Sequence, residues 1–255
     1  MWCGVDLGSR NVKVALLRED NKFSFYVFDT IRFYREWGRM KEGCLTVDLP
    51  GLLQAEGLKA ENTVSTGYGR QTIKLKGARN IPEIRAHVSG AIYSTGLQDF
   101  TLLDLGGQDS KVALVRGGRM VDFQTNDKCA ASTGRYLENM ASVLDITMDE
   151  LSKHYENPVD LVATCAIFGE TELVGKIVEG YSVESLAAGV NYTIYKRVLP
   201  LLANLKSDKI VFTGGVARNQ ALRHIIGEKL GVEVVVPEKP AFVGAIGCSL
   251  TAKGG

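Results

Sequence analysis

The segment Asp6–Arg18, DLGSRNVKVALLR, occurs a second time in the chain as Asp104–Arg116, DLGGQDSKVALVR. The two segments are identical at eight of thirteen positions, including the Asp, the Gly two residues later and the Lys-Val-Ala-Leu run. In each, an Asp ends a strand and a Gly follows in a hairpin, where its missing side chain lets backbone N–H groups approach a ligand. Two such turns facing each other across a cleft would hold a polyphosphate from both sides. The repeat therefore predicts a duplicated domain rather than a solenoid, whose periods are about 20–50 residues.

Composition and charge restrict the classes of protein to which the chain can belong. Its 255 residues are 45% hydrophobic and 23% charged, enough for a sizeable buried core in one or two domains. The formal charge of +1 points to neither nucleic acid nor an anionic membrane. The apolar runs are too short for a membrane span, and the start lacks a signal-peptide pattern. We therefore expect a cytoplasmic protein that binds no nucleic acid and no membrane.

Hydrophobic periodicity divides the chain into two halves that open alike, residues 1–97 and 98–255, with a final helix that can pack back on the first half. In the first half it predicts strands at Cys3–Leu7, Lys13–Arg18, Phe23–Phe28 and Thr63–Ser65, a helix after Asp48 and a helix over Pro82–Thr95. In the second half it predicts strands at Thr101–Leu105, Lys111–Val115, Met120–Gln124, Lys209–Phe212 and Val232–Val236, with helices after Ser132, Gly169, Ser182 and Val216 and from Ala241.

The repeated segments supply the predicted nucleotide site. Carboxylates are hard oxygen ligands of the kind that Mg²⁺ prefers, so we expect Asp6 and Asp104 to hold this ion directly or through water. One copy alone would fit an ordinary hairpin equally well, but two copies with matching Asp, Gly and Lys favour a phosphate site. The predicted catalytic residues are Asp6, Asp104, Gln108 and Asp109, and the predicted cofactor contacts in the two loops are Gly8, Ser9, Arg10, Asn11, Lys13, Gly106 and Gly107.

A third glycine element, FTGGVARN at Phe212–Asn219, joins a strand to a helix. The first N–H groups of that helix and its positive dipole end suit a phosphate or an adenosine. In this order after two hairpin loops, the element resembles the actin, sugar kinase and Hsp70 superfamily of ATPases. The resemblance implies an α/β fold of two ribonuclease H-like halves with the nucleotide cleft between them. It adds to the predicted cofactor contacts Gly134, Gly214, Gly215, Val216 and Asn219.

Two of the five cysteines precede helical patterns, Cys129 in NDKCAASTGRYLENMA and Cys165 in VATCAIFGETELVGKI. A thiolate just ahead of a helix N-terminus is stabilised by the helix dipole and suits an anionic iron–sulfur cluster. A [4Fe–4S] cluster usually takes four thiolates, which a twofold dimer would supply as two from each chain. The odd number and irregular spacing of the cysteines argue against a disulfide framework, which leaves metal binding or simple burial.

These segments together resemble the ATP-dependent activators, or component A, of 2-hydroxyacyl-CoA dehydratases, which are related to the ATPase subunits of benzoyl-CoA reductase. The resemblance covers essentially the whole chain, and its motifs are DLGS at Asp6, TGYGR at Thr66, EIRAH at Glu83, DLGGQD at Asp104, CAASTGR at Cys129, CAIFGETE at Cys165, FTGGVARN at Phe212 and VGAIG at Val243. It implies ATP or ADP with Mg²⁺, and a homodimer with one [4Fe–4S] cluster held by Cys129 and Cys165 of each chain. It also implies ATP-driven electron delivery to a partner iron–sulfur dehydratase or reductase, with ferredoxin or flavodoxin as the electron donor.

The chain departs from this family at two positions. The first loop of relatives commonly continues Ser-Thr, where this chain has Ser9-Arg10, and this affects the expected phosphate contacts. A cysteine often found before the family histidine is Ala86 here, so Ala86 has no ligand role.

Further residues have both structural and functional interpretations. Cys3 and Cys248 are expected to be buried small hydrophobes, and Cys44 an incidental thiol. His87 suits a structural role, a partner contact or the stabilisation of a charge. Arg70 suits an interface contact or a phosphate contact. Glu170 and Glu172 are interpreted as acids in the first turn of a helix, where they complement the helix dipole, or as residues that position a helix end or a nucleotide.

Three functions are compatible with these patterns. The first is an ATP-hydrolysing reductive activator whose partner is a 2-hydroxyacyl-CoA dehydratase, a benzoyl-CoA reductase type enzyme or a double-cubane cluster protein. The second is a small-molecule kinase of the same superfamily, with Asp109 as the base. The third is a non-catalytic nucleotide-binding scaffold in which Cys129 and Cys165 bind zinc or nothing.

Overall fold

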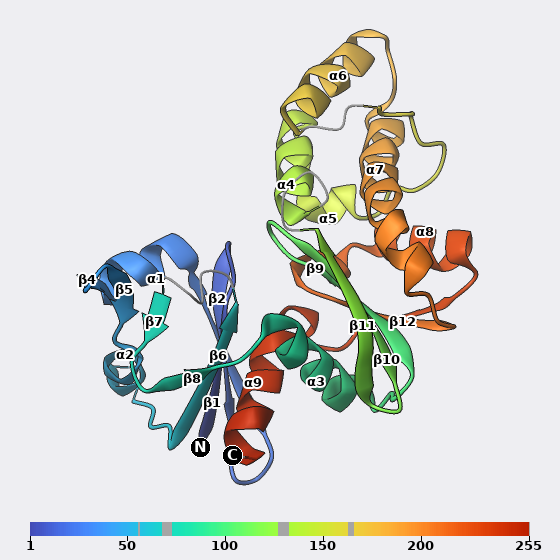
Figure 1. Ribbon diagram of the computed structural model, residues 1–255. Helices are drawn as coiled ribbons and strands as arrows, with labels where there is room; N and C mark the ends of the chain where they lie inside the picture. Colours follow the sequence, from blue (N-terminus) through green and yellow to red (C-terminus); the bar gives the residue numbers. More distant parts are fainter. Residues whose placement is uncertain (56, 68–72, 127–132, 163–165, 255) are drawn as a thin grey trace. The chain divides into compact units, whose positions relative to one another are not determined.

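The computed structural model describes residues 1–55, 57–67, 73–126, 133–162 and 166–254, which form two compact units (Figure 1). Unit 1 comprises Met1–Leu97 and Phe242–Gly255, and unit 2 comprises Gln98–Ala241. The last helix, α9 (Val243–Gly254), therefore belongs to unit 1 although the whole of unit 2 precedes it in the chain.

Each unit is built on a five-stranded sheet, and the two sheets have the same topology. The strand order is β3-β2-β1-β6-β8 in unit 1 and β11-β10-β9-β12-β13 in unit 2. In both, three antiparallel strands joined by hairpins are followed by two strands that run parallel to the central one. The predicted duplicated α/β fold is therefore confirmed. The bounds of the strands are β1 (Trp2–Leu7), β2 (Asn11–Leu17), β3 (Phe23–Asp29), β6 (Asn62–Gly67), β8 (Ala78–Asn80), β9 (Phe100–Leu105), β10 (Ser110–Arg116), β11 (Arg119–Asn126), β12 (Lys209–Thr213) and β13 (Glu233–Val235).

Helices and one small sheet complete the units. Unit 1 has α1 (Thr30–Trp37), α2 (Leu49–Ala55) and α3 (Glu83–Thr95) besides α9, and a three-stranded sheet of β4 (Gly38–Lys41), β5 (Cys44–Val47) and β7 (Ile73–Leu75). Unit 2 has α4 (Gly134–Val143), α5 (Met148–Leu151), α6 (Ala166–Val178), α7 (Val183–Asn204) and α8 (Gln220–Leu230), with 3₁₀ turns η2 (Gly215–Arg218) and η3 (Pro240–Phe242).

The alternation of side chains along β1 decides which residues reach the two faces of the unit 1 sheet. Cys3, Val5 and Leu7 enter an apolar cluster that includes residues of α1 and α2. Gly4 is on the opposite face, where α9 packs so closely that a Cβ on Gly4 would overlap the carbonyl oxygen of Ala245. Asp6 shares the face of Gly4, and it is therefore directed toward the side that α3 and α9 cover.

Two helices of unit 2 differ from the sequence predictions at their starts. α6 begins at Ala166, ahead of the predicted start after Gly169. The helix predicted after Val216 begins with the 3₁₀ turn η2 and continues as α8 only from Gln220, because Asn219 caps the α-helix by accepting a hydrogen bond from the Leu222 N–H. The sequence predictions also omitted α1, α5 and the small sheet, which are short elements with few buried residues.

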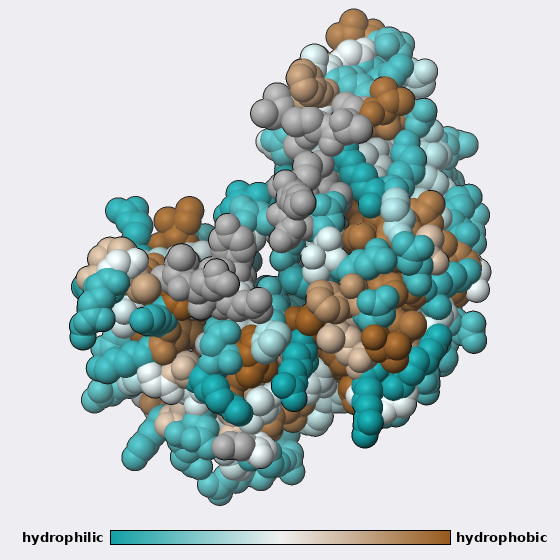
Figure 2. All heavy atoms as spheres, viewed as in Figure 1, coloured by the Kyte–Doolittle hydropathy of each residue, from teal (hydrophilic) through white to brown (hydrophobic). Residues whose placement is uncertain are grey.

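The α6 helix of unit 2 combines a buried side with an exposed apolar side. Leu173 is fully buried against the unit 2 core, whereas Phe168 and Val178 are 70% and 83% exposed. Figure 2 shows brown, apolar side chains at this end of the unit among teal ones. None of the helices in the described part of the chain has the length and hydropathy needed to cross a membrane.

Candidate functional site

The first predicted phosphate loop is the β1–β2 hairpin of unit 1. Asp6 is the fifth of the six residues of β1 and pairs in register with Lys13 on β2. The Lys13 ammonium lies 3.5 Å from Asp6 Oδ2, and the Asp6 side chain is only 3% exposed. Burial and then the negative charge of Asp6 raise the pKa of Tyr34 to about 12. The hairpin therefore holds a buried carboxylate and a cation at the end of the central strand.

The bend of this first loop depends on a close backbone approach at Gly8. A Cβ on Gly8 would lie 2.6 Å from the Asn11 carbonyl oxygen, so a larger residue would force the hairpin apart. Thr30, the first residue of α1, holds the loop from outside, since its hydroxyl donates to the Gly8 carbonyl at 2.8 Å and its N–H to the Arg10 carbonyl at 3.2 Å. The predicted contacts of this loop, Gly8, Ser9, Arg10, Asn11 and Lys13, thus lie together in one hairpin.

The second predicted loop is the β9–β10 hairpin of unit 2, where Asp104 pairs in register with Lys111. Asp104 is buried, and its Oδ1 accepts a hydrogen bond of 2.8 Å from the Thr213 hydroxyl on β12. The Lys111 ammonium lies 2.5 Å from Asp109 Oδ2. Asp109, the base of the alternative kinase hypothesis, is therefore engaged in an ion pair within the loop. Gln108 lies beside it in the same hairpin and is partly exposed.

The second loop is bonded directly to the N-terminus of α4. The Gly134 and Arg135 N–H groups donate to the carbonyls of Gly106 and Gly107 at 2.9 and 3.2 Å. The Thr133 hydroxyl donates to the Gly107 carbonyl at 2.8 Å. Gly134 favours this approach, because a Cβ there would make a tight contact of 3.3 Å with the Gly106 carbonyl oxygen. A displacement of the loop would therefore be transmitted to α4.

The third glycine element lies at the end of β12. Gly214 has φ +88°, and a Cβ on it would overlap the Leu105 carbonyl oxygen, so this position requires glycine. Gly215 starts η2, and Val216 lies close to Gly134, whose Cβ would be 3.3 Å from the Val216 side chain. Asn219 is 5% exposed, and its amide donates to Asn191 at 2.8 Å in addition to capping α8.

Comparison with known proteins identifies the family of the chain. Residues 3–252 match the BadF/BadG/BcrA/BcrD ATPase family. The chain belongs to this ATPase family. The predicted resemblance to dehydratase activators and benzoyl-CoA reductase ATPases is thereby confirmed.

Individual relatives of this ATPase family agree with the assignment. The 2-hydroxyisocaproyl-CoA dehydratase activator of Clostridioides difficile is 34% identical over 98% of this chain and 93% of its own. The (R)-2-hydroxyglutaryl-CoA dehydratase activating ATPase of Acidaminococcus fermentans is 36% identical over 74% of each chain. A solved structure of the 2-hydroxyisocaproyl-CoA dehydratase activator from Clostridium difficile with bound ADPNP superposes with a TM-score of 0.83 and 29% identity, covering 99% of this chain and 94% of that one.

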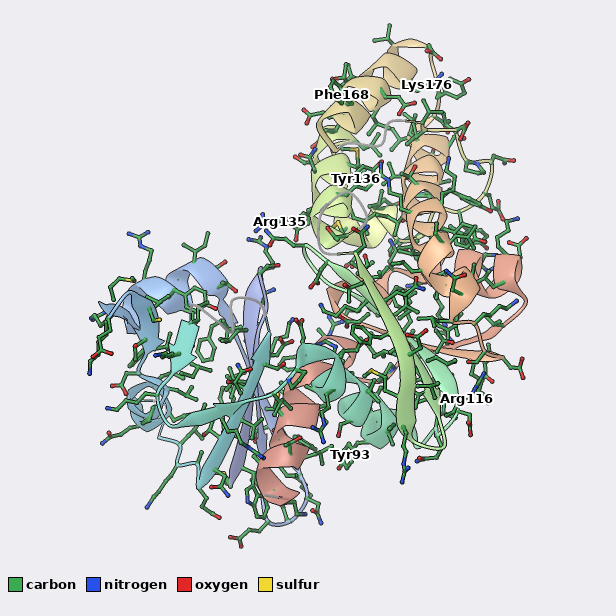
Figure 3. The ribbon with its side chains drawn as sticks, viewed as in Figure 1. Tyr93, Arg116, Arg135, Tyr136, Phe168 and Lys176 are labelled. Carbon is green, nitrogen blue, oxygen red and sulfur yellow. The ribbon has the colours of Figure 1, made fainter. Side chains whose placement is uncertain are left out.

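The predicted cluster ligands of this ATPase, Cys129 and Cys165, lie outside the described residues, as does Arg70. The two helices that follow these cysteines in sequence are described, with Arg135 and Tyr136 on α4 and Phe168 and Lys176 on α6 (Figure 3). They pack together where Gly169 approaches the ring of Tyr136, at 3.4 Å from a Gly169 Cβ position.

The interpretation of Glu170 and Glu172 as first-turn acids of a helix was wrong. Because α6 begins at Ala166, its first turn contains no acidic residue and both glutamates fall in the next turn. Both carboxylates accept hydrogen bonds from other segments instead. Glu170 accepts one from the Asn139 side-chain amide at 3.2 Å, and Glu172 accepts one from the Val162 backbone N–H at 2.9 Å. Both therefore connect α6 to neighbouring segments of unit 2.

The burial predicted for Cys3 and Cys248 is confirmed, since both thiols are fully buried. Burial is the main cause that raises the pKa of Cys3 to about 12 and the pKa of Cys248 well above its usual range. Ala86 is also fully buried, and its carbonyl oxygen would overlap a Cβ on Gly247 of α9.

Sequence reasoning missed the threonines that hold the two loops, Thr30, Thr133 and Thr213. The sequence did contain a signal for Thr213, because a Thr-Gly pair ends two equivalent strands, as Thr66-Gly67 in unit 1 and as Thr213-Gly214 in unit 2. Gly67 and Gly214 both have positive φ. The pairs are not identical in their bonding, since Thr66 donates to the Ile81 carbonyl at 2.9 Å rather than to Asp6.

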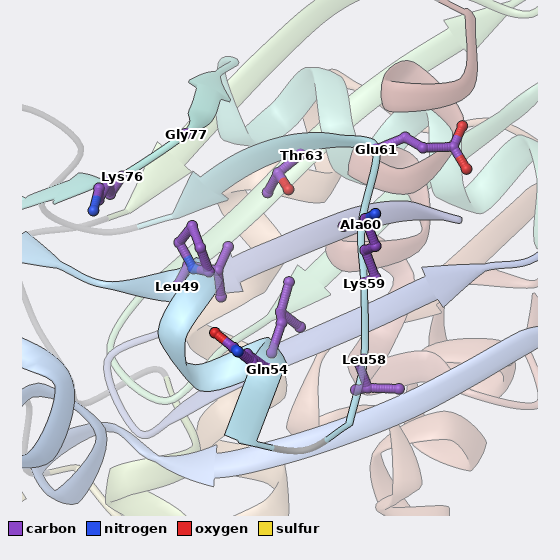
Figure 4. Close-up of a pocket in the computed structure, with 11 residues that line it drawn as sticks. Leu49, Gln54, Leu58, Lys59, Ala60, Glu61, Thr63, Lys76 and Gly77 are labelled. Carbon is purple, nitrogen blue, oxygen red and sulfur yellow. The ribbon is translucent and has the colours of Figure 1, made fainter.

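Unit 1 contains a pocket of about 440 Å³ whose lining residues fall between Leu49 and Gly77 (Figure 4). Leu53 and Leu58 form apolar parts of its wall, and Lys59 and Lys76 polar parts. None of the described residues that line it belongs to the β1–β2 hairpin, so it is distinct from the predicted phosphate loop.

Proposed function

We propose that this protein hydrolyses ATP to deliver a low-potential electron from an iron–sulfur cluster to a partner iron–sulfur enzyme. The partner class is a 2-hydroxyacyl-CoA dehydratase, a benzoyl-CoA reductase type enzyme or a double-cubane cluster protein, and ferredoxin or flavodoxin is the electron donor. The family assignment and the activators among its relatives support this proposal. The observation that carries it is the hydrogen bonding of the second phosphate loop to the helix that follows Cys129.

The two hairpin loops are the proposed binding sites for the ATP phosphates. Asp6 and Asp104 occupy equivalent register positions at the ends of the two central strands, and both are buried. Asp6 Oδ1 accepts no hydrogen bond from the described part of the chain, which fits an oxygen that serves a cation. Mg²⁺ bound there would neutralise phosphate charge in the transition state. The loops themselves orient the nucleotide through Lys13 and through backbone N–H groups near Gly106.

Cys129 and Cys165 of two chains are the proposed ligands of one [4Fe–4S] cluster. Each cysteine precedes a helix, α4 and α6 respectively, and α6 begins at the residue directly after Cys165. The positive end of a helix dipole stabilises thiolates and an anionic cluster. Because one chain supplies two such cysteines, a homodimer completes the usual set of four.

The bonds between α4 and the second loop supply a route from nucleotide to cluster. A nucleotide that binds one arrangement of the Gly106–Gly107 loop more tightly than another also selects the position of α4. By reciprocity, a partner that prefers that position of α4 tightens nucleotide binding. We therefore expect tighter partner binding with a non-hydrolysable ATP analogue than with ADP.

Iron analysis of anaerobically purified protein tests the cluster. We expect about four irons per dimer, loss of the cluster in Cys129→Ala and in Cys165→Ala, and retention in the matched control Cys44→Ala. Cys44 suits this control because it lies on β5 in unit 1, away from α4 and α6. A full cluster in the Cys129→Ala protein would overturn the model of two ligands per chain.

Partner affinity and single-turnover electron transfer test the coupling. Both are measured on the reduced protein with ATP analogue, with ADP and without nucleotide. Equal affinities and equal transfer rates in all three states would leave ATP hydrolysis without the proposed role.

A further inference from the structure

A cluster of metal-ligating side chains lies in unit 1 on the face of β1 that α3 and α9 cover. Asp6 comes from β1, and Glu83 and His87 come from the first turns of α3, one helical turn apart. Each of these three residues offers one possible ligand atom, a carboxylate oxygen or an imidazole nitrogen, and the three atoms all lie within 4.8 Å of one another. In the described part of the chain, this is the one such group of three.

The geometry of this cluster approaches that of a metal site. A first-row divalent cation binds imidazole nitrogen and carboxylate oxygen at about 2.0–2.2 Å, which brings its ligand atoms within about 4.4 Å of one another. His87 Nε2 and Glu83 Oε1 are already 4.0 Å apart. The Glu83 side chain is 21% exposed, and a small rotation of it would close the remaining gap. The same exposure leaves room for water ligands on that side.

The burial of Asp6 is the second observation that points to a cation. Asp6 is 2% exposed, and its Oδ1 accepts no hydrogen bond from any described residue. The Lys13 ammonium approaches the other oxygen, Oδ2, at 3.5 Å. A buried carboxylate oxygen is costly unless a donor or a cation serves it, so the lone pairs of Oδ1 favour a cation bound by the Asp6 carboxylate.

The backbone of α9 passes close to His87 Nε2 and to Asp6 Oδ2. Gly244 is the residue of α9 that faces them, and a Cβ there would lie 2.6 Å from His87 Nε2 and 3.1 Å from Asp6 Oδ2. A side chain at position 244 would therefore fill the volume next to the imidazole nitrogen. Glycine therefore lets α9 approach His87 and Asp6 without displacing either side chain.

We propose that Asp6, Glu83 and His87 form a binding site for a divalent transition-metal ion in the nucleotide-free protein. One imidazole and two carboxylates with open positions for water suit Mn²⁺, Fe²⁺ or Zn²⁺ better than Mg²⁺, which seldom takes a nitrogen ligand. This site goes beyond the Mg²⁺ of the proposed ATPase, because two of its three ligands come from α3.

The other histidines of the chain provide a built-in comparison. His154 and His224 each pair with a glutamate one helical turn away, Glu150 at 2.9 Å and Glu228 at 3.5 Å. Neither has a third ligand close enough to form a group of three in the described residues. A His–Glu pair at a spacing of four residues is thus present three times, and only the one at His87 has the added carboxylate.

Mn²⁺ binding to the full chain without nucleotide and without reductant tests the proposal. Mn²⁺ is the probe because it has little affinity for thiolates, so Cys129 and Cys165 do not compete for it. Free Mn²⁺ is counted by its electron paramagnetic resonance, and pulsed measurements on bound Mn²⁺ detect coupling to the nitrogen of a ¹⁵N-labelled histidine.

We expect one Mn²⁺ per chain with a histidine nitrogen coupling. His87→Gln should remove the coupling and weaken binding at least about 10-fold, and Glu83→Gln should weaken it without removing the coupling. The matched control His224→Gln should retain both. Gly244→Ala keeps all three ligands and should also weaken binding, and circular dichroism verifies that each variant is folded.

Bound Mn²⁺ without a histidine coupling, or equal affinity in the wild type and His87→Gln, would overturn the proposal. An absence of Mn²⁺ binding in the wild type would overturn it as well. None of these measurements uses ATP hydrolysis, so their failure leaves the proposed ATPase function unaffected.

Discussion

The two units carry the same hairpin at the end of the central strand, but they hold its carboxylate differently. In unit 1, Asp6 pairs with Lys13 and lies beside residues of α3. In unit 2, Asp104 accepts the Thr213 hydroxyl, and the lysine equivalent to Lys13 pairs with Asp109 instead. The duplicated loop has therefore kept its shape while its charged groups have acquired different partners.

A second difference follows the third strand of each unit. In unit 1, β3 ends at Asp29 and α1 begins at Thr30, whereas residues 127–133, including Cys129, separate β11 from α4. A threonine nevertheless stands at the start of each helix, Thr30 as the first residue of α1 and Thr133 as the N-cap of α4, and each donates to a glycine carbonyl of the loop. The comparison teaches that unit 2 retains the connection between loop and helix and adds a cysteine segment ahead of it.

The largest expected effect is the loss of ATP hydrolysis on neutralising either carboxylate. Asp104→Asn keeps an acceptor for Thr213 but removes the charge for Mg²⁺, and we expect hydrolysis to fall roughly 10²–10³-fold while the cluster spectrum stays unchanged. Asp6→Asn should have a similar effect if the two loops are equivalent. Steady-state phosphate release measures both. Full activity in one variant alone would show that only one of the two loops acts on the nucleotide.

The glycines that follow the parallel strands offer a matched test of stability. Gly67 and Gly214 have φ of +113° and +88°, and in each a Cβ would meet the backbone of the neighbouring strand at Leu7 or Leu105. Gly67→Ala and Gly214→Ala should each lower the free energy of unfolding by about 1–3 kcal/mol from backbone strain alone. Urea unfolding measures the change in stability. Gly180→Ala is the control, because Gly180 has positive φ but open space around it, so this variant carries the backbone strain without the overlap of a Cβ with a neighbouring strand.

The helix-to-loop bonds should contribute less to stability and more to coupling. Thr133→Val removes the donor to Gly107 at constant shape, which costs about 1 kcal/mol and should slow ATP-dependent electron transfer roughly 5-fold. Thr30→Val is the matched change in unit 1 and should lower stability without altering the cluster's response to nucleotide. Equal effects of both variants on electron transfer would contradict the special role of α4.

The smallest expected effect concerns thiol reactivity. Because burial raises the pKa of Cys3 to about 12, its thiol stays protonated in the folded protein at pH 8, and the same cause protects Cys248. The half-exposed Cys44 should therefore react with iodoacetamide much sooner. The raised pKa of the Cys3 thiol also affects stability. Because this thiol ionises near pH 9 in the unfolded chain and near pH 12 in the folded protein, the free energy of unfolding should fall as the pH rises from about 9 to about 12. Mass spectrometry of peptides after timed labelling measures the order of reaction.

The repeat in the sequence was sufficient to predict a duplicated domain and both hairpins, because glycine and strand periodicity are local signals, whereas the α/β fold of two similar halves was predicted from the resemblance to an ATPase superfamily. The repeat was insufficient for the residues that support the hairpins, since Thr213 reaches Asp104 across 109 positions of sequence. The starts of α6 and α8 were misplaced for a different reason. Gly169 resembles a helix boundary but packs inside α6 against Tyr136, and Gly215 starts a 3₁₀ turn rather than the α-helix. Glu83 was visible only as part of a motif, and its proximity to Asp6 depends on the packing of α3.

The return of α9 to unit 1 has a consequence for folding during synthesis. Residues 98–241 of unit 2 leave the ribosome before α9, so unit 2 can fold while unit 1 still lacks a helix. Until then the face of β1 that carries Gly4 and Asp6 is without the cover of α9, including the bond of 2.7 Å from the Ser249 hydroxyl to the Ala15 carbonyl. The nascent unit 1 therefore presents a sheet face without the cover of α9 for the time needed to translate the whole of unit 2, and this interval is when it most needs protection from aggregation.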